Sequence, residues 1–407
     1  MRRRFLSSVK SISGEGDYQS DYFTIEALED GLTANLSINA CEYCIDGDGA
    51  WKTLTADTNT EAINTGHTLS FRGNLTPDST NGIGTFTISK NCSVKGNIMS
   101  LLFGDNGKYN FSLAGYDYAF YKLFYEQRTI IDASNLILPA LTLSLRCYSY
   151  MFQNTSITKT PSLPAETLYQ HCYSYMFYNC TKLTTITNLD SITLADQCYS
   201  YMFYGCTSLV KAVDILPAMT MKTQCYHNMF RSCKVMTTAP ILPALDLVSN
   251  CYYCMFYGCS KLNYVKALFL TTPSSTVTQS WLKDVASAGT FVKNKNATWD
   301  VVGGNGIPEG WTVQNYVENN LITFTINGSE YQAEEGMTYR DWLLSSYNTS
   351  NQVINDNFGV KASNMVLFSY IIFDASNNYV KNETAGYPIL EETITDGYKF
   401  TLTFEPM

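Results

Sequence analysis

The stretch His171–Gln197, HCYSYMFYNCTKLTTITNLDSITLADQ, decides how the chain is organised, because it recurs. The pair Cys-Tyr returns at steps of 25, 26, 27 and 26 residues, and Met-Phe begins four residues after each of these Cys. In every copy but the first, a second Cys stands eight residues after the first Cys, and Thr155 takes its place in the first copy. One unit of this length cannot bury its own apolar face, so we expect the units to stack on one another. The residues expected to form the repeat core are Cys172, Met176, Phe177, Cys180, Cys198, Met202, Phe203, Cys206, Cys225, Met229, Phe230, Cys233, Cys251, Met255, Phe256 and Cys259.

The spacing within one repeat predicts a short helix followed by a strand. Cys172, Met176 and Cys180 fall at i, i+4 and i+8, which share one face of a helix. Residues Lys182–Thr187 alternate like a strand. Stacked units of this kind predict a right-handed solenoid with parallel strands about 4.8 Å apart.

The repeats also resemble a known family. The segments MFYNCTKLTTI (Met176–Ile186), MFYGCTSLVKA (Met202–Ala212) and MFYGCSKLNYV (Met255–Val265) are similar to the BspA-like, bacterial surface-antigen class of leucine-rich repeats. The resemblance covers roughly the middle third of the chain. The flanking segments resemble those that such repeats carry in proteins of gut Bacteroides and of their bacteriophages. The resemblance implies a leucine-rich repeat fold and a role in surface or virion adhesion.

Together these observations predict a mixed α/β fold class, with a leucine-rich repeat solenoid flanked by an N-terminal β-sandwich and a small C-terminal α+β domain of β-grasp-like form. Short strands separated by turn signals favour the sandwich, and Ser280–Ala288 is expected to be a helix that follows the repeats. The Asn327-Gly328 pair predicts a hairpin, and Thr338 begins a predicted helix that ends at Tyr347. The expected segments are a flexible basic arm over 1–20, the sandwich over 21–107, the solenoid over 108–270, a cap and linker over 271–320 and the α+β domain over 321–407.

Composition and charge argue against several classes of function. The net charge of -9, from 27 basic and 36 acidic residues, disfavours nucleic-acid binding. Only three His occur, far apart in sequence, and the sequence lacks nucleotide-binding and hydrolase motifs, so we expect no enzyme and no cofactor. The longest apolar run, Met365–Phe373, is of strand length, which predicts no membrane insertion. The start of the chain carries no export signal as written, which favours reduced, buried thiols.

Two short motifs could bind metal ions, and a structural interpretation is preferred for each. Cys41-x-x-Cys44 would need Cys92 or His67 as further ligands, at a spacing that matches no zinc signature. The Asp-Gly-Asp-Gly run at 46–49 lacks the remaining ligands of a calcium loop and stands where a hairpin turn is expected. The sequence therefore predicts no metal site, and whether Cys41, Cys44 and Cys92 do more than pack stays open.

Aromatic rows are the more informative candidates for binding. The row Tyr148, Tyr173, Tyr199, Tyr226 and Tyr252 is expected to be core. A second row, Tyr178, Tyr204 and Tyr257, is expected at the surface, where tyrosine suits contact with sugars or proteins.

The basic cluster Arg2, Arg3, Arg4 and Lys10 is either a solvated tail or an arm that orders on an acidic partner subunit.

The function predicted from the sequence is that of a non-enzymatic adhesion protein. Because no export signal is encoded, we favour a bacteriophage virion component, a head or tail fibre or a decoration, assembled in the host cytoplasm. Its expected partners are other virion proteins through the N-terminal region and a host-surface glycan or protein. A homo-oligomer is expected, and a trimer by analogy with fibres. The alternatives are a bacterial cell-surface adhesin and an accessory module of a carbohydrate-active system.

Overall fold

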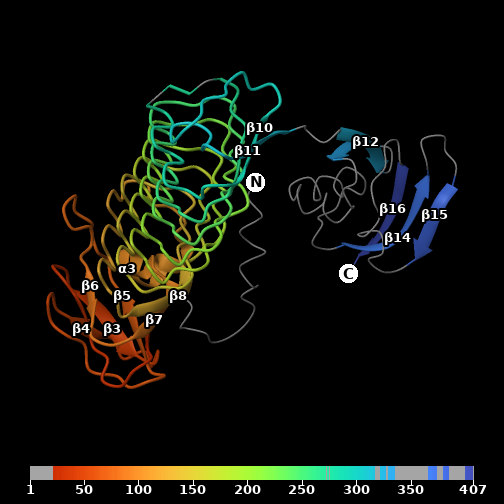
Figure 1. Ribbon diagram of the computed structural model, residues 1–407. Coiled ribbons are helices and arrows are strands. Elements are labelled where there is room, and N and C mark those ends of the chain that lie inside the picture. Colours follow the sequence, from red (N-terminus) through yellow and green to blue (C-terminus); the bar gives the residue numbers. More distant parts are fainter. Residues whose placement is uncertain are drawn as a thin grey trace. The chain divides into compact units, whose positions relative to one another are not determined.

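The chain divides into two compact units, the larger within Ile12–Tyr316 and the smaller containing Val317–Met407 (Figure 1). A computed structural model describes residues 22–271, 273–274 and 276–316, and beyond them the backbone of five strands. The predicted basic arm over 1–20 and the predicted helix from Thr338 to Tyr347 lie outside the described residues.

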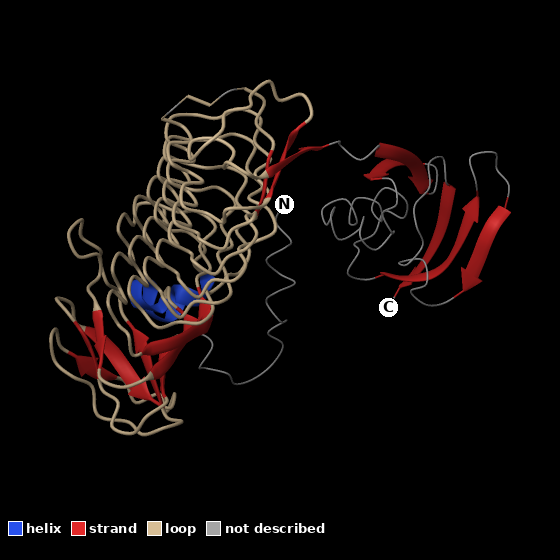
Figure 2. Ribbon diagram, viewed as in Figure 1, coloured by secondary structure: helices blue, strands red, loops and turns tan. Residues whose placement is uncertain are grey.

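A six-stranded sheet begins the larger unit. Its strands, in spatial order, are β4 (Lys52–Leu54), β3 (Cys41–Ile45), β5 (Thr68–Arg72), β1 (Phe23–Ala27), β7 (Cys92–Asn97) and β8 (Ile130–Ile137). All neighbours pair antiparallel except β7 and β8, which are parallel. A two-stranded sheet, β2 (Ala34–Leu36) with β6 (Phe86–Ile88), accompanies it. The connection after β7 holds the short helix α3 (Ser100–Phe103) and the 3-10 helix η1 (Gly104–Tyr109), as Figure 2 shows.

Aromatic side chains join this sheet to the repeats. The Phe23 ring centroid lies 5.7 Å from that of Phe71, 5.2 Å from that of Phe86 and 5.5 Å from that of Phe124. Phe124 precedes the first Cys-Tyr repeat, and its ring centroid lies 5.2 Å from that of Phe152 in that repeat. Because every one of these rings is fully buried, the sheet and the repeats share one continuous core.

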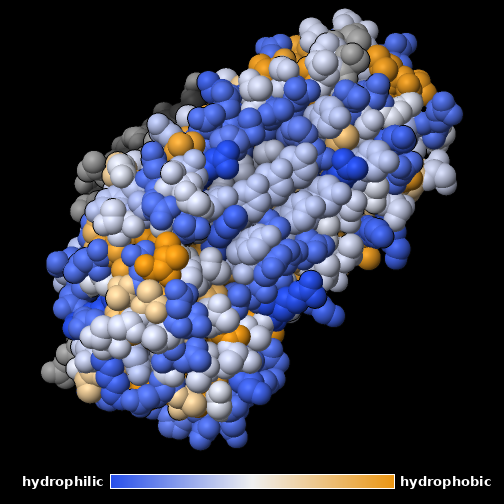
Figure 3. Space-filling model, turned by 90° about the vertical axis from the view of Figure 1, so that its left-hand side faces the viewer, coloured by the Kyte–Doolittle hydropathy of each residue, from blue (hydrophilic) through white to orange (hydrophobic). Residues whose placement is uncertain are grey.

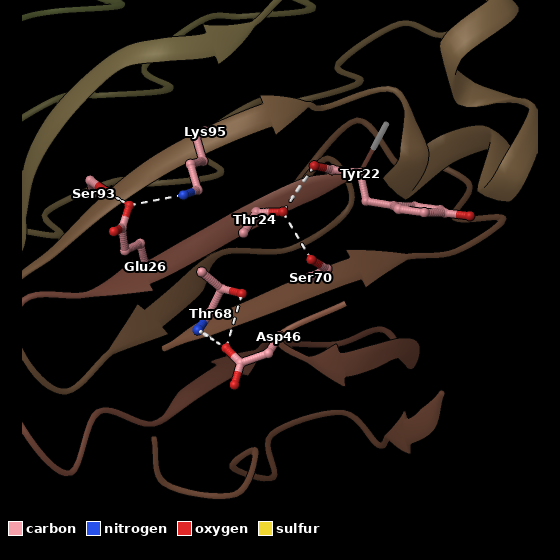
Figure 4. A network of polar contacts seen from close by, with 8 residues as sticks. All are labelled: Tyr22, Thr24, Glu26, Asp46, Thr68, Ser70, Ser93 and Lys95. Carbon is pink, nitrogen blue, oxygen red and sulfur yellow. Dashed lines mark hydrogen bonds and ion pairs between the residues drawn. The ribbon is translucent and has the colours of Figure 1, made fainter. Parts of the chain in front are cut away.

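Polar side chains fix the register of the central strands (Figure 4). The hydroxyls of Thr24 and Ser70 lie 3.0 Å apart between β1 and β5, both buried. Lys95 of β7 donates to Glu26 of β1 over 3.0 Å, beside a 3.2 Å hydrogen bond from Ser93 to the same carboxylate. A one-residue slip would break the Thr24–Ser70 hydrogen bond and separate Lys95 from Glu26, so the network specifies the pairing.

The repeats consist of turns that are hydrogen-bonded alternately within and between units. Met176 N–H donates to Tyr173 of its own repeat over 3.2 Å, whereas Tyr175 and Phe177 N–H donate to Ser200 and Met202 of the next over 2.9 and 3.0 Å. Every fourth residue has a left-handed backbone, with φ of 56° at His171, 58° at Tyr175 and 57° at Asn179. The same alternation returns in each later repeat, as at Tyr201 and Phe203. Each unit therefore completes its backbone hydrogen bonds on its neighbours and not along a helix.

The predicted mixed α/β class with a leucine-rich repeat solenoid is wrong. The described residues hold strands, turns and a single short α-helix, α3, and their sheets do not form a solenoid. The helix expected in each repeat is absent because left-handed residues interrupt it and because its N–H groups donate across repeats. The strand expected over 182–187 is reduced to isolated bridges such as Lys159 with Thr185. The predicted Ser280–Ala288 helix is likewise a run of turns and bends.

A parallel three-stranded sheet and two tryptophans end the repeats. The strands, in spatial order, are β11 (Thr312–Tyr316), β10 (Thr290–Asn294) and β9 (Tyr264–Ala267). The Trp281 ring lies 6.0 Å from the Tyr252 ring, and its Nε1 donates to the Gly306 carbonyl over 2.8 Å. Trp299 stacks on Phe269 at 4.4 Å between ring centroids. The last repeat is thus covered by large rings whose polar atoms are satisfied.

The smaller unit contains a five-stranded sheet. Its strands, in spatial order, are β13 (Ser329–Glu334), β12 (Leu321–Ile326), β16 (Lys399–Pro406), β14 (Met365–Phe373) and β15 (Tyr379–Thr384). The β12–β13 hairpin pairs antiparallel, as the Asn-Gly turn predicts, and β12 runs parallel to β16.

Candidate functional site

One face of the larger unit carries parallel rows of pale side chains, whose colour marks the intermediate hydropathy of residues such as tyrosine (Figure 3). Two columns of half-buried side chains from successive repeats run along the stack. The first column consists of Tyr150, Tyr175, Tyr201, His227 and Tyr253. The second column consists of Tyr178, Tyr204, Arg231 and Tyr257. Together they are named the tyrosine face.

The rings of the first column stack closely. The Tyr175 ring centroid lies 4.5 Å from that of Tyr150 and 4.5 Å from that of Tyr201, with interplanar angles of 5° and 8°. His227 continues the column 5.2 Å from Tyr201, and Tyr253 follows at 4.7 Å. These spacings follow from the backbone hydrogen bonds that hold neighbouring repeats in register.

The first column changes its position in the repeat partway along. Tyr150, Tyr175 and Tyr201 stand three residues after the first Cys of their repeats, whereas His227 and Tyr253 stand two residues after it. The ring thus moves to the position that Ser occupies in the earlier copies. The column stays continuous in space although the sequence register shifts.

The second column combines tyrosines with a cation. The rings of Tyr178 and Tyr204 stack at 4.8 Å and 10°. The Arg231 guanidinium carbon lies 5.5 Å from the Tyr204 ring centroid and 4.4 Å from that of Tyr257. The two columns touch where Tyr175 meets Tyr178 at 5.6 Å. The face is therefore one connected aromatic surface with a positive charge toward its C-terminal end.

Stacking decides which part of each ring a ligand can reach. Because each central ring lies against the next, its flat faces are covered, and its edge and hydroxyl remain accessible. Burial, followed by the neighbouring phenols, raises the pKa of Tyr175, and burial also raises the pKa of Tyr150 and Tyr178. The phenols therefore keep their protons at neutral pH and can donate hydrogen bonds.

The structure brings together part of the sequence-predicted site. Tyr178 and Tyr204 stack directly, and Tyr257 joins them through Arg231. The first column was missed, although Ser-Tyr-Met in three repeats and the matching His227 and Tyr253 could have indicated it. The predicted arm residues Arg2, Arg3, Arg4 and Lys10 lie outside the described residues.

The row expected to be core is buried. Tyr148, Tyr173, Tyr199, Tyr226 and Tyr252 are each 1% exposed, and their rings stack at 5.8 to 6.1 Å. The Cys, Met and Phe residues expected to form the repeat core have no exposed surface. The tyrosine face thus lies over a fully packed interior.

The second cysteine of each repeat donates a hydrogen bond to a backbone carbonyl. The Sγ of Cys180 donates to the Phe152 carbonyl of the preceding repeat over 3.0 Å, and Cys206 donates to Phe177 over 3.2 Å. In the first copy Thr155 stands at this position, and its hydroxyl donates to the Phe152 carbonyl of its own repeat over 2.8 Å. Burial raises the pKa of Cys180 to about 12, so the group stays a neutral thiol.

The candidate metal ligands outside the repeats are buried as free thiols or hydrogen-bonded to neighbouring residues. Cys41, Cys44 and Cys92 are buried free thiols, and burial raises the pKa of Cys41 and Cys92 to about 12. Asp46 accepts from Thr68 N–H at 2.8 Å, and its other oxygen lies 2.6 Å from His67 Nδ1. Within the described part of the chain, no three His, Cys, Asp or Glu side chains are grouped to hold a metal ion.

Comparison of the chain with protein-family models, with curated proteins and with solved structures finds no match. Among the described residues, no helix is both long and apolar enough to cross a membrane.

Proposed function

We propose that the protein is a non-enzymatic adhesion module that binds an extended polysaccharide along the tyrosine face. The observation that carries the proposal is the ladder of stacked phenols: the rings of Tyr150, Tyr175 and Tyr201 lie 4.5 Å apart in the first column, and those of Tyr178 and Tyr204 lie 4.8 Å apart in the second. This spacing is comparable to the length of one pyranose unit in an extended chain. Successive sugars can therefore meet successive hydroxyls.

The rigidity of the face favours binding by many weak contacts. A free tyrosine loses side-chain entropy when it binds a ligand, at about 0.5–1.5 kcal/mol for each immobilised side chain. Tyr175 is already held by stacking on both sides, against Tyr150 and Tyr201, and Tyr178 and Tyr204 stack on each other. Each hydrogen bond to a sugar then contributes with little ordering cost, and the contacts of a long chain act together.

We place this module on a bacteriophage particle, as a head or tail fibre or a decoration protein. The support for this location is the resemblance of the repeats to the BspA-like class and the basic cluster at the start of the chain. A bacterial cell-surface adhesin is the alternative location for the same binding face. Proteomics of purified particles distinguishes the two, since the proposed location requires the chain in the particle at a fixed ratio to the other structural proteins.

The binding proposal is tested by removing hydroxyls and keeping rings. The double variant Tyr175→Phe with Tyr201→Phe preserves the stack of the first column. Loss of two hydrogen bonds, at about 0.5–1.5 kcal/mol each, predicts a roughly 5- to 150-fold weaker affinity for a polysaccharide that the native protein binds. Glycan arrays followed by affinity electrophoresis provide the measurement.

The matched control is Tyr169→Phe, the same chemical change at an exposed tyrosine outside both columns, whose side chain is 52% exposed. It should leave the affinity unchanged. Equal affinity of the native protein and the double variant for every bound glycan would exclude the tyrosine face as the binding surface.

A further inference from the structure

Arg231 is held in one orientation on the tyrosine face. Its Nη1 donates to Asn228 Oδ1 over 3.1 Å, and the buried Asn228 is fixed by backbone hydrogen bonds to neighbouring residues, including one from its N–H to Tyr253. The guanidinium also packs between the rings of Tyr204 and Tyr257. The side chain is therefore ordered before any ligand arrives, which lowers the entropy lost on binding.

The charge of Arg231 is not balanced within the described part of the chain. The ion pairs there involve other cations, among them Arg72 with Glu42 and Lys211 with Asp214. A second cation, the exposed Lys283, lies 5.7 Å from the centroid of the same Tyr257 ring. Arg231 belongs to the repeat before Tyr257 and Lys283 to the segment that follows it, so two cations contact one ring from neighbouring units in a chain whose net charge is -9.

The positive charge of Arg231 also affects the pKa of the neighbouring His227. Burial, and then the charge of Arg231, lowers the pKa of His227 to about 4. His227 is consequently neutral at physiological pH and does not add to the charge. The positive character of the site belongs to Arg231 and Lys283.

We propose that Arg231 and Lys283 form a carboxylate site on the tyrosine face and that the polysaccharide bound there is acidic, with uronic-acid units. This inference rests on the proposed polysaccharide binding and specifies its substrate class. The forked N–H groups of arginine match the two oxygens of a carboxylate, and Lys283 adds a second positive charge from the segment that follows Tyr257. The phenol ladder contacts sugar hydroxyls, while the cationic pair selects the charged units and fixes where they lie along the face.

The test compares acidic polysaccharides with their own neutral forms. Polygalacturonate, alginate and hyaluronate are each assayed beside the carboxyl-reduced polymer, so that only the charge differs. The native protein is expected to bind at least one acidic polymer about 10-fold or more tightly than its reduced counterpart. This preference should weaken as salt concentration rises.

Two variants remove the charges separately. Arg231→Gln should reduce the acidic preference by about 10-fold or more, and it is compatible with the fold because Gln153 occupies the equivalent position of the first repeat. Lys283→Gln changes an exposed side chain and should reduce the preference to a smaller extent. Lys182→Gln is the matched control, an exposed lysine outside both columns, and should retain the full preference.

The possible outcomes distinguish failure of the carboxylate site from failure of polysaccharide binding. Equal binding of the acidic and reduced polymers, with a loss of affinity in the Tyr175 and Tyr201 double variant, would overturn the carboxylate site and leave polysaccharide binding intact. Binding of no polymer in either series would overturn both.

Discussion

Substitution of Gly258 distinguishes the turn structure of the repeats from the helix that the sequence predicts. Gly258 lies between Met255 and Cys259, the positions expected on one helix face, and its φ is 74°. A Cβ added there would meet the Ser232 Oγ at 3.4 Å, which is ordinary contact, so the effect of alanine comes from backbone conformation alone. The matched comparison is asparagine, which the first two repeats carry at the equivalent positions Asn154 and Asn179.

A left-handed turn and a helix at Gly258 predict opposite orders of stability for the native protein and the two variants. A left-handed backbone disfavours alanine by about 1–2 kcal/mol, and the lower entropy of the unfolded chain offsets about 0.4–1 kcal/mol of this. Gly258→Ala should therefore lower the free energy of unfolding by about 1 kcal/mol, whereas Gly258→Asn should leave it nearly unchanged, because asparagine tolerates this conformation. In a helix, alanine would be the most stable of the three by about 0.6–1 kcal/mol.

Urea denaturation followed by circular dichroism measures the order directly. The same native protein and the two variants are compared at one pH, and the midpoints are converted with a common slope. If Gly258→Ala unfolds at the highest urea concentration of the three, the left-handed turn assignment is refuted.

Three further predictions concern the core, the first column and the thiols. Phe203→Ala should lower the free energy of unfolding by about 3–5 kcal/mol, because a fully buried ring stacked at 5.5 and 5.6 Å on its neighbours leaves a cavity; a loss below 1 kcal/mol in denaturant titrations would contradict this packing. His227 has a folded-state pKa of about 4, below its unfolded value near 6.5, so its contribution is present above pH 6.5 and is lost as pH falls toward 4. Discounted for partial exposure, the loss is about 1–2 kcal/mol, and His227→Gln should flatten this part of the stability–pH curve; parallel curves for the two proteins would be inconsistent with it. All thirteen cysteines are buried, so iodoacetamide should label them only after unfolding, and rapid labelling of Cys180 in the native chain, detected by mass spectrometry, would argue against its burial.

The sequence predicted which residues share a face but not the backbone that places them there. Cys172, Met176 and Cys180 recur every four residues, and a left-handed residue in every fourth position produces the same alignment as a helix. Periodicity alone cannot separate these structures. Asn179 and the glycines at the equivalent position of other repeats are the local signal for left-handed turns, whereas Tyr175 at φ of 58° gives no such signal and depends on stacking and on contacts between repeats.

The candidate site was predictable in part for a related reason. The row Tyr178, Tyr204 and Tyr257 shares one sequence register, so it was found. The first column shifts by one residue at His227, and Arg231 replaces an aromatic residue in the second, so neither column keeps one residue type at one sequence position along its whole length. Stacking of the rings, which turns their edges and hydroxyls outward, also depends on distances that the sequence does not contain.

The central claim is that the tyrosine face binds an extended chain through repeated phenol contacts, and the dependence of affinity on ligand length tests it most directly. Calorimetric titration with size-fractionated oligosaccharides of a polymer that the native protein binds provides the measurement. Affinity should rise with each added sugar until the ligand spans the columns, and the Tyr175→Phe, Tyr201→Phe variant should reduce the gain per sugar. Affinity that is already complete with a mono- or disaccharide and unchanged in longer ligands would contradict the account.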